Sequence, residues 1–209
     1  MNAASPVALP ELLTQRLAVQ LPGREAQRRF EPDLGFGRHF GPPPHDARLA
    51  AVIVLLYPSA GEWHVPLTVR PLELTAHGGQ ISLPGGSIEP DETDEAAALR
   101  ELQEELDVAP SDVTPLGRLT PLYIFGTKFW VQPWLAVCDR HPAFRPHADE
   151  VAELLEVPLS QLRNPAGWDS HARIVRGLES TVPHIRVGEH RVWGATAMIL
   201  SELIALVGE

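Results

Sequence analysis

The chain has 209 residues, of which 44% are hydrophobic and 21% charged, a composition typical of one globular domain with a substantial core. Its formal net charge of −10 argues against a nucleic-acid polymer as partner, because polymer binding draws on many phosphate contacts from Lys and Arg. No apolar run approaches the roughly 20 residues that span a bilayer, and the N-terminus lacks the basic-then-apolar order of a secretory signal. We therefore expect a cytoplasmic protein with no membrane partner.

The N-terminal part of the chain is predicted to be a helix followed by an irregular segment. Leucines recur at helical spacing within residues 11–20, and residues 30–47 are rich in Pro and Gly. We expect residues 1–47 to form an N-terminal helix and lead-in that pack on a domain of residues 48–209.

Strands and helices alternate in the rest of the chain. The continuous apolar run at residues 49–57 is typical of a central strand covered on both faces. The same patterns predict, in chain order, a turn at 58–61, a strand at 63–70, a helix at about 94–106, strands near 115–123, 129–138 and 150–157, and an amphipathic helix at 195–207. This order indicates an α+β fold in which a mixed sheet lies between helices as an α/β/α sandwich.

The single cysteine, Cys138, excludes an internal disulfide and any thiolate cluster for zinc. It ends the apolar run 134–138, where packing is a far more common role than catalysis. We therefore expect a buried thiol.

The helix predicted at 94–106 carries a concentration of carboxylates. At about 100° per residue, Glu101, Glu104 and Glu105 fall within an arc of roughly 100°, while the leucines of the helix lie on another side. Crowded carboxylates repel one another unless a cation lies between them, and Mg²⁺ is usually held by a few carboxylates plus substrate phosphates. The alternative is a solvated acidic helix face.

Two neighbouring features favour the metal site over the solvated face. Arg100 directly precedes the first of these carboxylates. Upstream, the pair Gly85 and Gly86 would let backbone approach a metal ion or a phosphate closely.

The stretch from Gly86 to Val108 resembles the Nudix box, G-x5-E-x7-R-E-U-x-E-E-x-G-U, where U is a bulky aliphatic residue. The positions that match at the required spacing are Gly86, Glu92, Arg100, Glu101, Leu102, Glu104, Glu105 and Val108. The one departure is Asp107, where the family has glycine. Asp tolerates the left-handed conformation better than most residues, so we expect altered helix-end geometry and retained chemistry.

The resemblance implies a Nudix-type sandwich fold and a pyrophosphohydrolase that depends on Mg²⁺, with Mn²⁺ able to substitute. It implies that Glu101, Glu104 and Glu105 are metal ligands together with the Gly86 carbonyl, and that Arg100 orients carboxylates. Glu92 would be structural or would support the metal ligands without binding the ion itself. The substrate would be a small-molecule nucleotide whose pyrophosphate is attacked in line by an activated water, with a carboxylate as base.

Upstream of the box, the chain resembles the additional motif of coenzyme A diphosphatases, roughly LLTxR[SA]x3Rx3Gx3FPGG. The fitting residues are Leu67, Thr68, Arg70, Gly79, Pro84, Gly85 and Gly86, and the departures are Pro66, Pro71, Thr75 and Leu83. Thr75 stands where the motif has a second arginine, which removes a charge partner for a phosphate. The resemblance implies that Arg70, Gly85 and Gly86 contact the substrate; the alternative for Arg70 is a surface charge that ends a strand.

The C-terminal half resembles the same subgroup at two segments. Asp149-Glu150-Val151 fits its D-E-V segment, and residues 192–197 around Trp193 fit its I-W-G-x-T-A segment. Glu150 would be an extra metal ligand or the catalytic base, against the alternative of a solvated loop carboxylate. Trp193 is expected to pack in the core. The favoured reaction converts coenzyme A to adenosine 3′,5′-bisphosphate and 4′-phosphopantetheine.

The sequence has two alternative interpretations and excludes a third. Another Nudix specificity, such as ADP-ribose, a nucleotide sugar or a dinucleoside polyphosphate, would share the catalytic helix and differ in the pocket. A non-catalytic Nudix-fold binding module or regulator need not keep the three glutamates together, as this chain does. A P-loop is excluded because no Gly-Lys-Ser/Thr follows Gly86. The sequence leaves a homodimer open.

Overall fold

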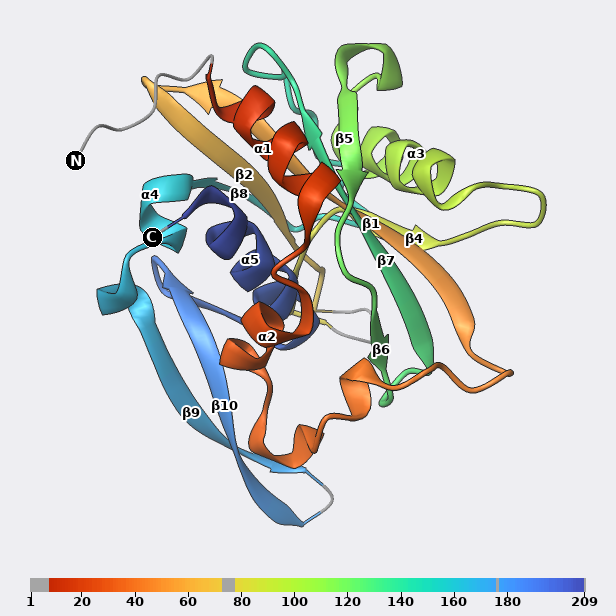
Figure 1. The fold of residues 1–209 in the computed structure, drawn as a ribbon, viewed down its shortest axis with the longest axis vertical. Coiled ribbons are helices and arrows are strands. Elements are labelled where there is room, and N and C mark those ends of the chain that lie inside the picture. Colours follow the sequence, from red (N-terminus) through yellow and green to blue (C-terminus); the bar gives the residue numbers. More distant parts are fainter. Residues whose placement is uncertain (1–7, 73–77, 176, 209) are drawn as a thin grey trace.

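A computed structural model of the chain describes residues 8–72, 78–175 and 177–208 (Figure 1). Its helices are α1 (Ala8–Val19), α2 (Gly23–Gln27), α3 (Asp94–Leu106), α4 (Leu159–Leu162) and α5 (Gly194–Val207). Its strands are β1 (Arg48–Ser59), β2 (Glu62–Val69), β3 (Ile81–Ser82), β4 (Gly85–Ser87), β5 (Thr114–Arg118), β6 (Leu122–Ile124), β7 (Phe129–Val137), β8 (Glu153–Pro158), β9 (Trp168–Val175), β10 (Leu178–Val187) and β11 (His190–Trp193). The predicted irregular lead-in contains short 3₁₀ turns at Arg28–Phe30, Asp33–Gly35 and Arg38–Phe40.

The main sheet is mixed, as predicted. Its strand order is β3-β2-β1-β7-β5, with β4 on β1, β6 on β7 and β8 on β2. β1 runs parallel to β7 from the Arg48↔Phe129 pair to the Leu56↔Val137 pair, and the other described pairings are antiparallel. β1 and β2 pair only beside their connecting turn and then diverge. β4 continues the pairing on β1, and β3 does so on β2. The Gly-rich segment therefore lies between the diverging strands.

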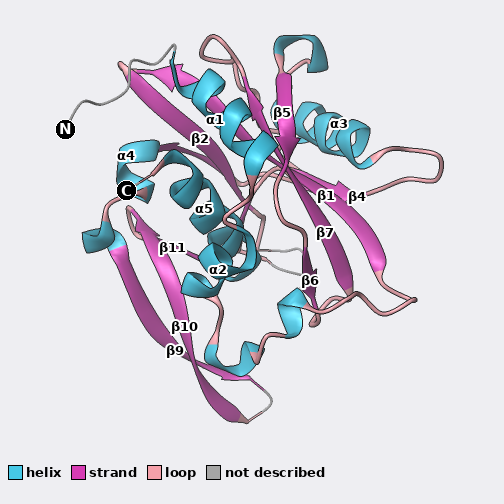
Figure 2. Ribbon diagram, viewed as in Figure 1, coloured by secondary structure: helices cyan, strands magenta, loops and turns pink. Residues whose placement is uncertain are grey.

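The sheet is covered on both faces, which confirms the α/β/α sandwich (Figure 2). Because side chains alternate along a strand, Ile53 and Leu55 of β1 pack with Leu102 and Leu106 of α3 on one face. Val54 and its neighbours on the other face pack in a larger core formed with α1, α5 and the 3₁₀ segments. Residues of the N-terminal lead-in thus contribute to the same core as the sheet.

The last helix differs from the prediction of an amphipathic helix. α5 is buried along most of its length, including the charged residue Glu202. A helix that is apolar on most sides is typical of the interior of a domain. The Glu202 carboxylate accepts hydrogen bonds from Gln27 Nε2 at 2.9 Å, from Thr120 Oγ1 at 2.7 Å and from the backbone N–H groups of Gly23 and Thr120. It thereby joins α2 and the β5–β6 connection to α5.

Other predictions were wrong in detail or missed an element. β1 extends through Ser59, and the turn is carried by Ala60 and Gly61, both with positive φ. The strand predicted at 115–123 is two strands, β5 and β6. The antiparallel sheet of order β11-β10-β9 was not predicted, because the apolar residues of its strands do not alternate regularly and β10 contains Pro183.

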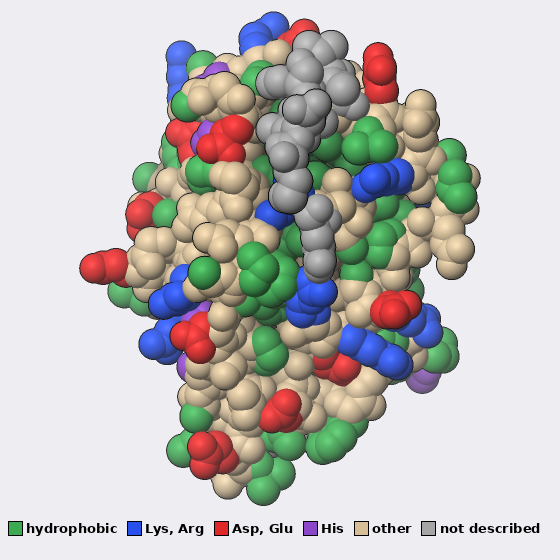
Figure 3. Space-filling view, turned by 60° about the vertical axis from the view of Figure 1, so that its left-hand side comes forward, with side chains coloured by type: hydrophobic (Ala, Val, Ile, Leu, Met, Phe, Trp, Pro, Cys, Tyr) green, Lys and Arg blue, Asp and Glu red, His purple; other side chains and the backbone are tan. Residues whose placement is uncertain are grey.

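Acidic and basic side chains alternate on one face of the molecule. On the face in Figure 3, acidic and basic side chains are interspersed rather than gathered by sign. None of the described helices is long and apolar enough to cross a membrane.

Candidate active site

The catalytic helix predicted from the sequence forms with the expected bounds. Thr93 caps its N-terminus, since its Oγ1 accepts the Ala96 N–H at 3.1 Å, and two acidic residues occupy the positive first turn. The helix ends at Asp107, whose φ of 58° confirms the left-handed conformation expected there. The Asp107 N–H donates to the Gln103 carbonyl at 2.9 Å.

Arg100 is the hydrogen-bonding centre of the box. Its Nε and Nη2 donate to the two oxygens of Glu92 at 3.0 and 3.1 Å. Its Nη1 donates to Glu101 at 2.9 Å and to Glu104 at 2.8 Å, and Nη2 also reaches the Ser87 carbonyl at 3.0 Å. The rigid guanidinium therefore fixes three carboxylates relative to the Gly-rich strand β4.

Three carboxylates gather beside the helix: Glu101, Glu105 and Glu150. One oxygen from each lies within 4.8 Å of those of the other two, and we call this set the carboxylate cluster. Glu104 lies outside this set; its side chain is 51% exposed and paired with Arg100. The helix arc alone therefore does not define the cluster, because one member comes from a distant loop.

Backbone hydrogen bonds bring Glu150 to the helix. The Arg145 N–H donates to the Leu106 carbonyl at 3.0 Å, and the His147 N–H donates to the Glu105 carbonyl at 2.9 Å. The Glu150 N–H then returns to the His147 carbonyl at 2.9 Å. The loop thus satisfies carbonyls at the C-terminal end of α3, which a helix leaves without internal partners.

The electrostatics of the cluster favour a bound cation. Glu105 is only 3% exposed, and burial raises its pKa to about 8, with the Glu101 carboxylate adding to the rise. Burial also raises the pKa of Glu101, against the opposing effect of Arg100. Oxygen ligands that repel one another and are costly to ionise fit a hard divalent ion, which neutralises them.

Gly85 and Gly86 leave no room for side chains. A Cβ on Gly86 would lie 2.3 Å from Oε1 of Glu101, so the backbone meets this carboxylate directly. A Cβ on Gly85 would lie 2.4 Å from the Ala51 carbonyl oxygen, and its φ of 153° is unfavourable for other residues. The Gly85 N–H donates to Oε1 of Glu105 at 3.4 Å.

Thr68 and Arg70 approach the cluster from the end of β2. Thr68 Oγ1 lies 3.5 Å from Oε2 of Glu105 and 3.1 Å from Ser82 Oγ. The positive charge of Arg70 opposes the rise in the pKa of Glu105. Within the part of the chain that the structure describes, the buried Nε of Arg70 has no hydrogen-bond partner. Thr75, the departure from the upstream motif, lies outside the described residues.

Thr68 and Ser82 were not selected as site residues from the sequence. The available signal was the match of Thr68 to the upstream motif, together with the antiparallel pairing that places Thr68 opposite Ser82. This contact joins two strands on either side of a loop, and periodicity does not reveal it.

Other candidate residues lie in different surroundings. Trp193 is half-buried beside the His171 ring and carries the Arg173 guanidinium over its face at 4.4 Å. Cys138 is buried, as predicted.

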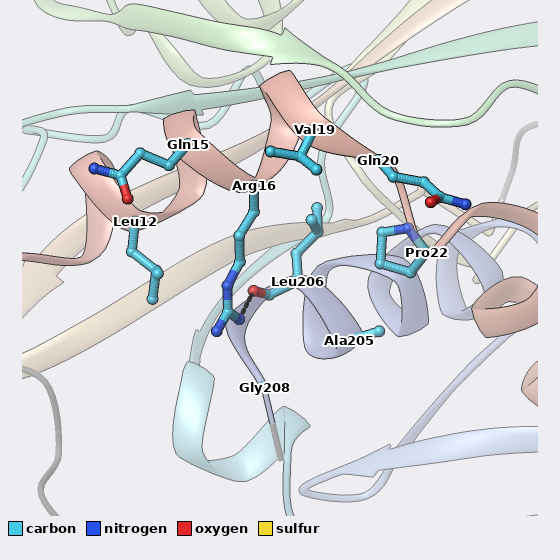
Figure 4. Close-up of a pocket in the computed structure, with 9 residues that line it drawn as sticks. All are labelled: Leu12, Gln15, Arg16, Val19, Gln20, Pro22, Ala205, Leu206 and Gly208. Atoms are coloured by element: carbon cyan, nitrogen blue, oxygen red, sulfur yellow. Dashed lines mark hydrogen bonds between the residues drawn. The ribbon is translucent and has the colours of Figure 1, made fainter.

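A hollow of about 670 Å³ lies on the other face of the sheet, between α1 and the end of α5 (Figure 4). Its lining residues are Leu12, Gln15, Arg16, Val19, Gln20, Pro22, Ala205, Leu206 and Gly208. Arg16 spans it and donates to the Leu206 carbonyl. The lining has no carboxylate, which distinguishes this hollow from the carboxylate cluster.

Comparison with known proteins decides the family. The family model described as NUDIX domain matches residues 47–178, which include α3, Arg70 and the whole carboxylate cluster. The chain is a Nudix hydrolase. Members of this family generally use divalent metal ions, and they act on nucleotide derivatives.

Relatives of this Nudix hydrolase carry the same assignment. It is 34% identical over 170 residues to the uncharacterized Nudix hydrolase NudL of Shigella flexneri, a match that covers 79% of this chain and 85% of the relative. It is 36% identical over 145 residues to NudL of Salmonella paratyphi B, covering 68% and 74%. The crystal structure of a MutT protein from Methanosarcina mazei matches with a TM-score of 0.51 and 16% identity over 76% of this chain and 92% of that one, which shows the shared fold.

Proposed function

We propose that this Nudix hydrolase cleaves the pyrophosphate of coenzyme A. The observation that carries the proposal is Arg70, a position of the upstream coenzyme A motif, whose buried Nε lacks a hydrogen-bond partner among the described residues and which lies near the carboxylate cluster. A buried donor without a partner is costly, and a substrate phosphate would satisfy it. Glu150 and Trp193, which match other segments of the same subgroup, support the proposal.

Glu101 and Glu105 are the proposed ligands of Mg²⁺, for which Mn²⁺ can substitute, with the Gly86 carbonyl and Glu104 as further ligands. The bound ion supplies neutralisation of the pyrophosphate and activation of water. Arg100 orients Glu101 and Glu104 through the hydrogen bonds described above.

Glu150, the exposed member of the cluster, is the proposed base. Water attacks one phosphorus as Glu150 takes its proton, and the bridging P–O bond breaks. The products are adenosine 3′,5′-bisphosphate and 4′-phosphopantetheine. The Gly85 and Gly86 backbone and Arg70 would bind the phosphates, because glycine lets backbone approach closely.

Product identification tests this proposal. The enzyme is incubated with Mg²⁺ and, separately, with coenzyme A, ADP-ribose, a nucleotide sugar and a dinucleoside polyphosphate, and products are identified by mass spectrometry. We expect the highest kcat/KM for coenzyme A. An ADP-ribose or nucleotide-sugar kcat/KM at least tenfold higher would reject coenzyme A while leaving the Nudix chemistry in place.

The role of Arg70 is tested by Arg70→Ala. If this arginine binds the ground and transition states alike, the variant should raise KM for coenzyme A more than it lowers kcat. Arg118→Ala is the matched control, because Arg118 is exposed and pairs with Asp94 outside the cluster. An unchanged KM in Arg70→Ala would remove the main support for the substrate.

A further inference from the structure

The second sheet ends in an open strand. Its order is β11-β10-β9, and no described element lies beyond β9 in Figure 1 or Figure 2. The family match stops at residue 178, at the start of β10, so most of β10 and all of β11 lie outside the general Nudix domain. Edge strands expose unpaired N–H and C=O groups, and proteins usually cover or interrupt them.

The backbone of β9 is oriented for further pairing. Ser170 of β9 lies opposite Pro183 of β10, and proline has no N–H to donate. On the other side of β10, the pairing with β11 ends at the His184↔Trp193 pair, so Pro183 has no partner in β11. Proline is tolerated where its nitrogen points to a side that has no paired strand, so the backbone groups of Pro183 point away from β9. Opposite residues of an antiparallel pair point their backbone groups either both toward or both away from each other, so the N–H and C=O of Ser170 point away from β10. The Ser170 N–H accordingly bonds Oδ1 of Asp169 on its own strand at 2.8 Å, a local contact that is exchanged when Ser170 pairs with another strand.

The outward groups continue along the strand. Because orientation alternates, Ala172 and Ile174 direct their backbone groups outward, as Ser170 does. Ile174 is 76% exposed, and β9 contains neither proline nor a bulge in its register with β10. An edge of this length is suited to accept another strand.

We propose that two copies of this chain pair through β9, antiparallel and about a two-fold axis at His171. In this register Asp169 of each copy lies opposite Arg173 of the other. The pairing is isologous, so one sequence supplies both charges and the ion pair forms twice. Asp169 and Arg173 are exposed and lie on the same face of the sheet as His171.

The opposite face of the same register is also complementary. Trp168 lies opposite Ile174 of the second copy, and Ser170 lies opposite Ala172. The backbone N–H and C=O groups of these residues point to the free edge of β9, so these residues form the hydrogen-bonded pairs between the two copies. Aromatic–β-branched pairs and opposite charges are both favourable across strands, and together they select this register over a shifted one.

Sedimentation velocity on the full chain, over a range of concentrations, tests the proposal. The wild type should form a dimer. Arg173→Asp places like charges opposite each other and should weaken the dimer at least about tenfold. The double variant Asp169→Arg/Arg173→Asp restores opposite charges and should restore the dimer. Arg191→Asp, an exposed residue on β11, is the control of equal charge change and should dimerise like the wild type.

A backbone variant gives an independent measurement. Ala172→Pro removes one outward N–H and should abolish the dimer while leaving the β9–β10 ladder intact. Melting temperatures of all variants separate loss of pairing from loss of fold. A monomeric wild type, a dimer that survives both Arg173→Asp and Ala172→Pro, or a double variant that stays monomeric while folded would each overturn the proposal.

Discussion

Two buried glutamates of this Nudix hydrolase show opposite solutions to the same physical difficulty. Glu105 in the carboxylate cluster and Glu202 in α5 are 3% and 0% exposed, and burial raises the pKa of both. Glu202 accepts two side-chain and two backbone donors, the closest at 2.7 Å. Among the described residues, Glu105 accepts from the Gly85 N–H at 3.4 Å and from the Thr68 hydroxyl at 3.5 Å, and two carboxylates lie beside it.

The difference separates a structural carboxylate from a functional one. A buried charge contributes to a fold only when its hydrogen bonds are made, as they are around Glu202. The cluster leaves that requirement unmet, which lowers the stability of the metal-free protein and creates affinity for a cation. Substitutions at the two sites should therefore have opposite consequences.

The largest expected effect is on catalysis. Glu105→Gln should lower turnover about a thousandfold or more, because it removes a ligand charge at the reacting centre. EDTA should abolish wild-type activity, and Mg²⁺ or Mn²⁺ should restore it. Glu95→Gln, on the same helix but outside the cluster, is the control and should keep its activity. Near-native turnover in Glu105→Gln, or full activity in metal-free buffer, would show that the carboxylates of α3 do not bind a catalytic metal ion.

The next effect is on stability at Glu202. Glu202→Gln puts an amide NH₂ group where four donors converge, so some donors lose their acceptor. The free energy of unfolding should fall by about 2 kcal/mol. Urea denaturation measures it, and an unchanged midpoint would mean that α2 and the β5–β6 connection do not depend on this carboxylate.

Glu105→Gln should shift stability in the other direction when metal is absent. A carboxyl with a raised folded-state pKa binds a proton that the unfolded chain has lost, so its contribution falls as pH rises from 4.5 to about 8. In EDTA at pH 8, the free energy of unfolding of the variant should exceed that of the wild type by at least about 1 kcal/mol, and this difference should shrink toward pH 5. A variant that is less stable at pH 8 would contradict the contrast with Glu202.

The smallest expected effect is a change in stability that comes from backbone conformation and not from charge. Asp107 ends α3 at a φ of 58°, which glycine adopts at little cost. Asp107→Gly should be neutral or slightly stabilising, whereas Asp107→Val should lose about 1 kcal/mol or more. Melting curves of the two variants decide the matter: equal tolerance of Val and Gly would show that this helix end stores no strain.

Sequence patterns predicted the structural features that depend on residues close together in the chain. The bounds of α3, its Thr93 cap and the left-handed Asp107 follow from local rules of helix ends, and the structure confirms them. Burial of Leu102 and Leu106 follows from helical periodicity. The resemblance, rather than any period, drew attention to Glu150, because its approach to α3 depends on hydrogen bonds from a distant loop.

Patterns failed where tertiary contacts override local composition. α5 was expected to be amphipathic, yet the N-terminal segment covers its remaining side and supplies Gln27 and Gly23 as partners for Glu202. The β9–β10 hairpin was missed because polar residues interrupt the apolar pattern of its strands, although Ile185 and Val187 of β10 are buried in the larger core. Glu104 pairs with Arg100 and lies outside the cluster, which helical spacing alone could not show.

The parallel pairing of β1 with β7 has a consequence for how the enzyme acquires activity. Gly85, Gly86 and α3 all belong to the stretch of chain that this pairing closes into a loop. Contacts between segments far apart in sequence form late, because closing a long loop costs entropy before the contact is made. During refolding, helical circular dichroism should therefore recover before the ability to bind Mn²⁺, so a chain can have its catalytic helix in place and still be inactive.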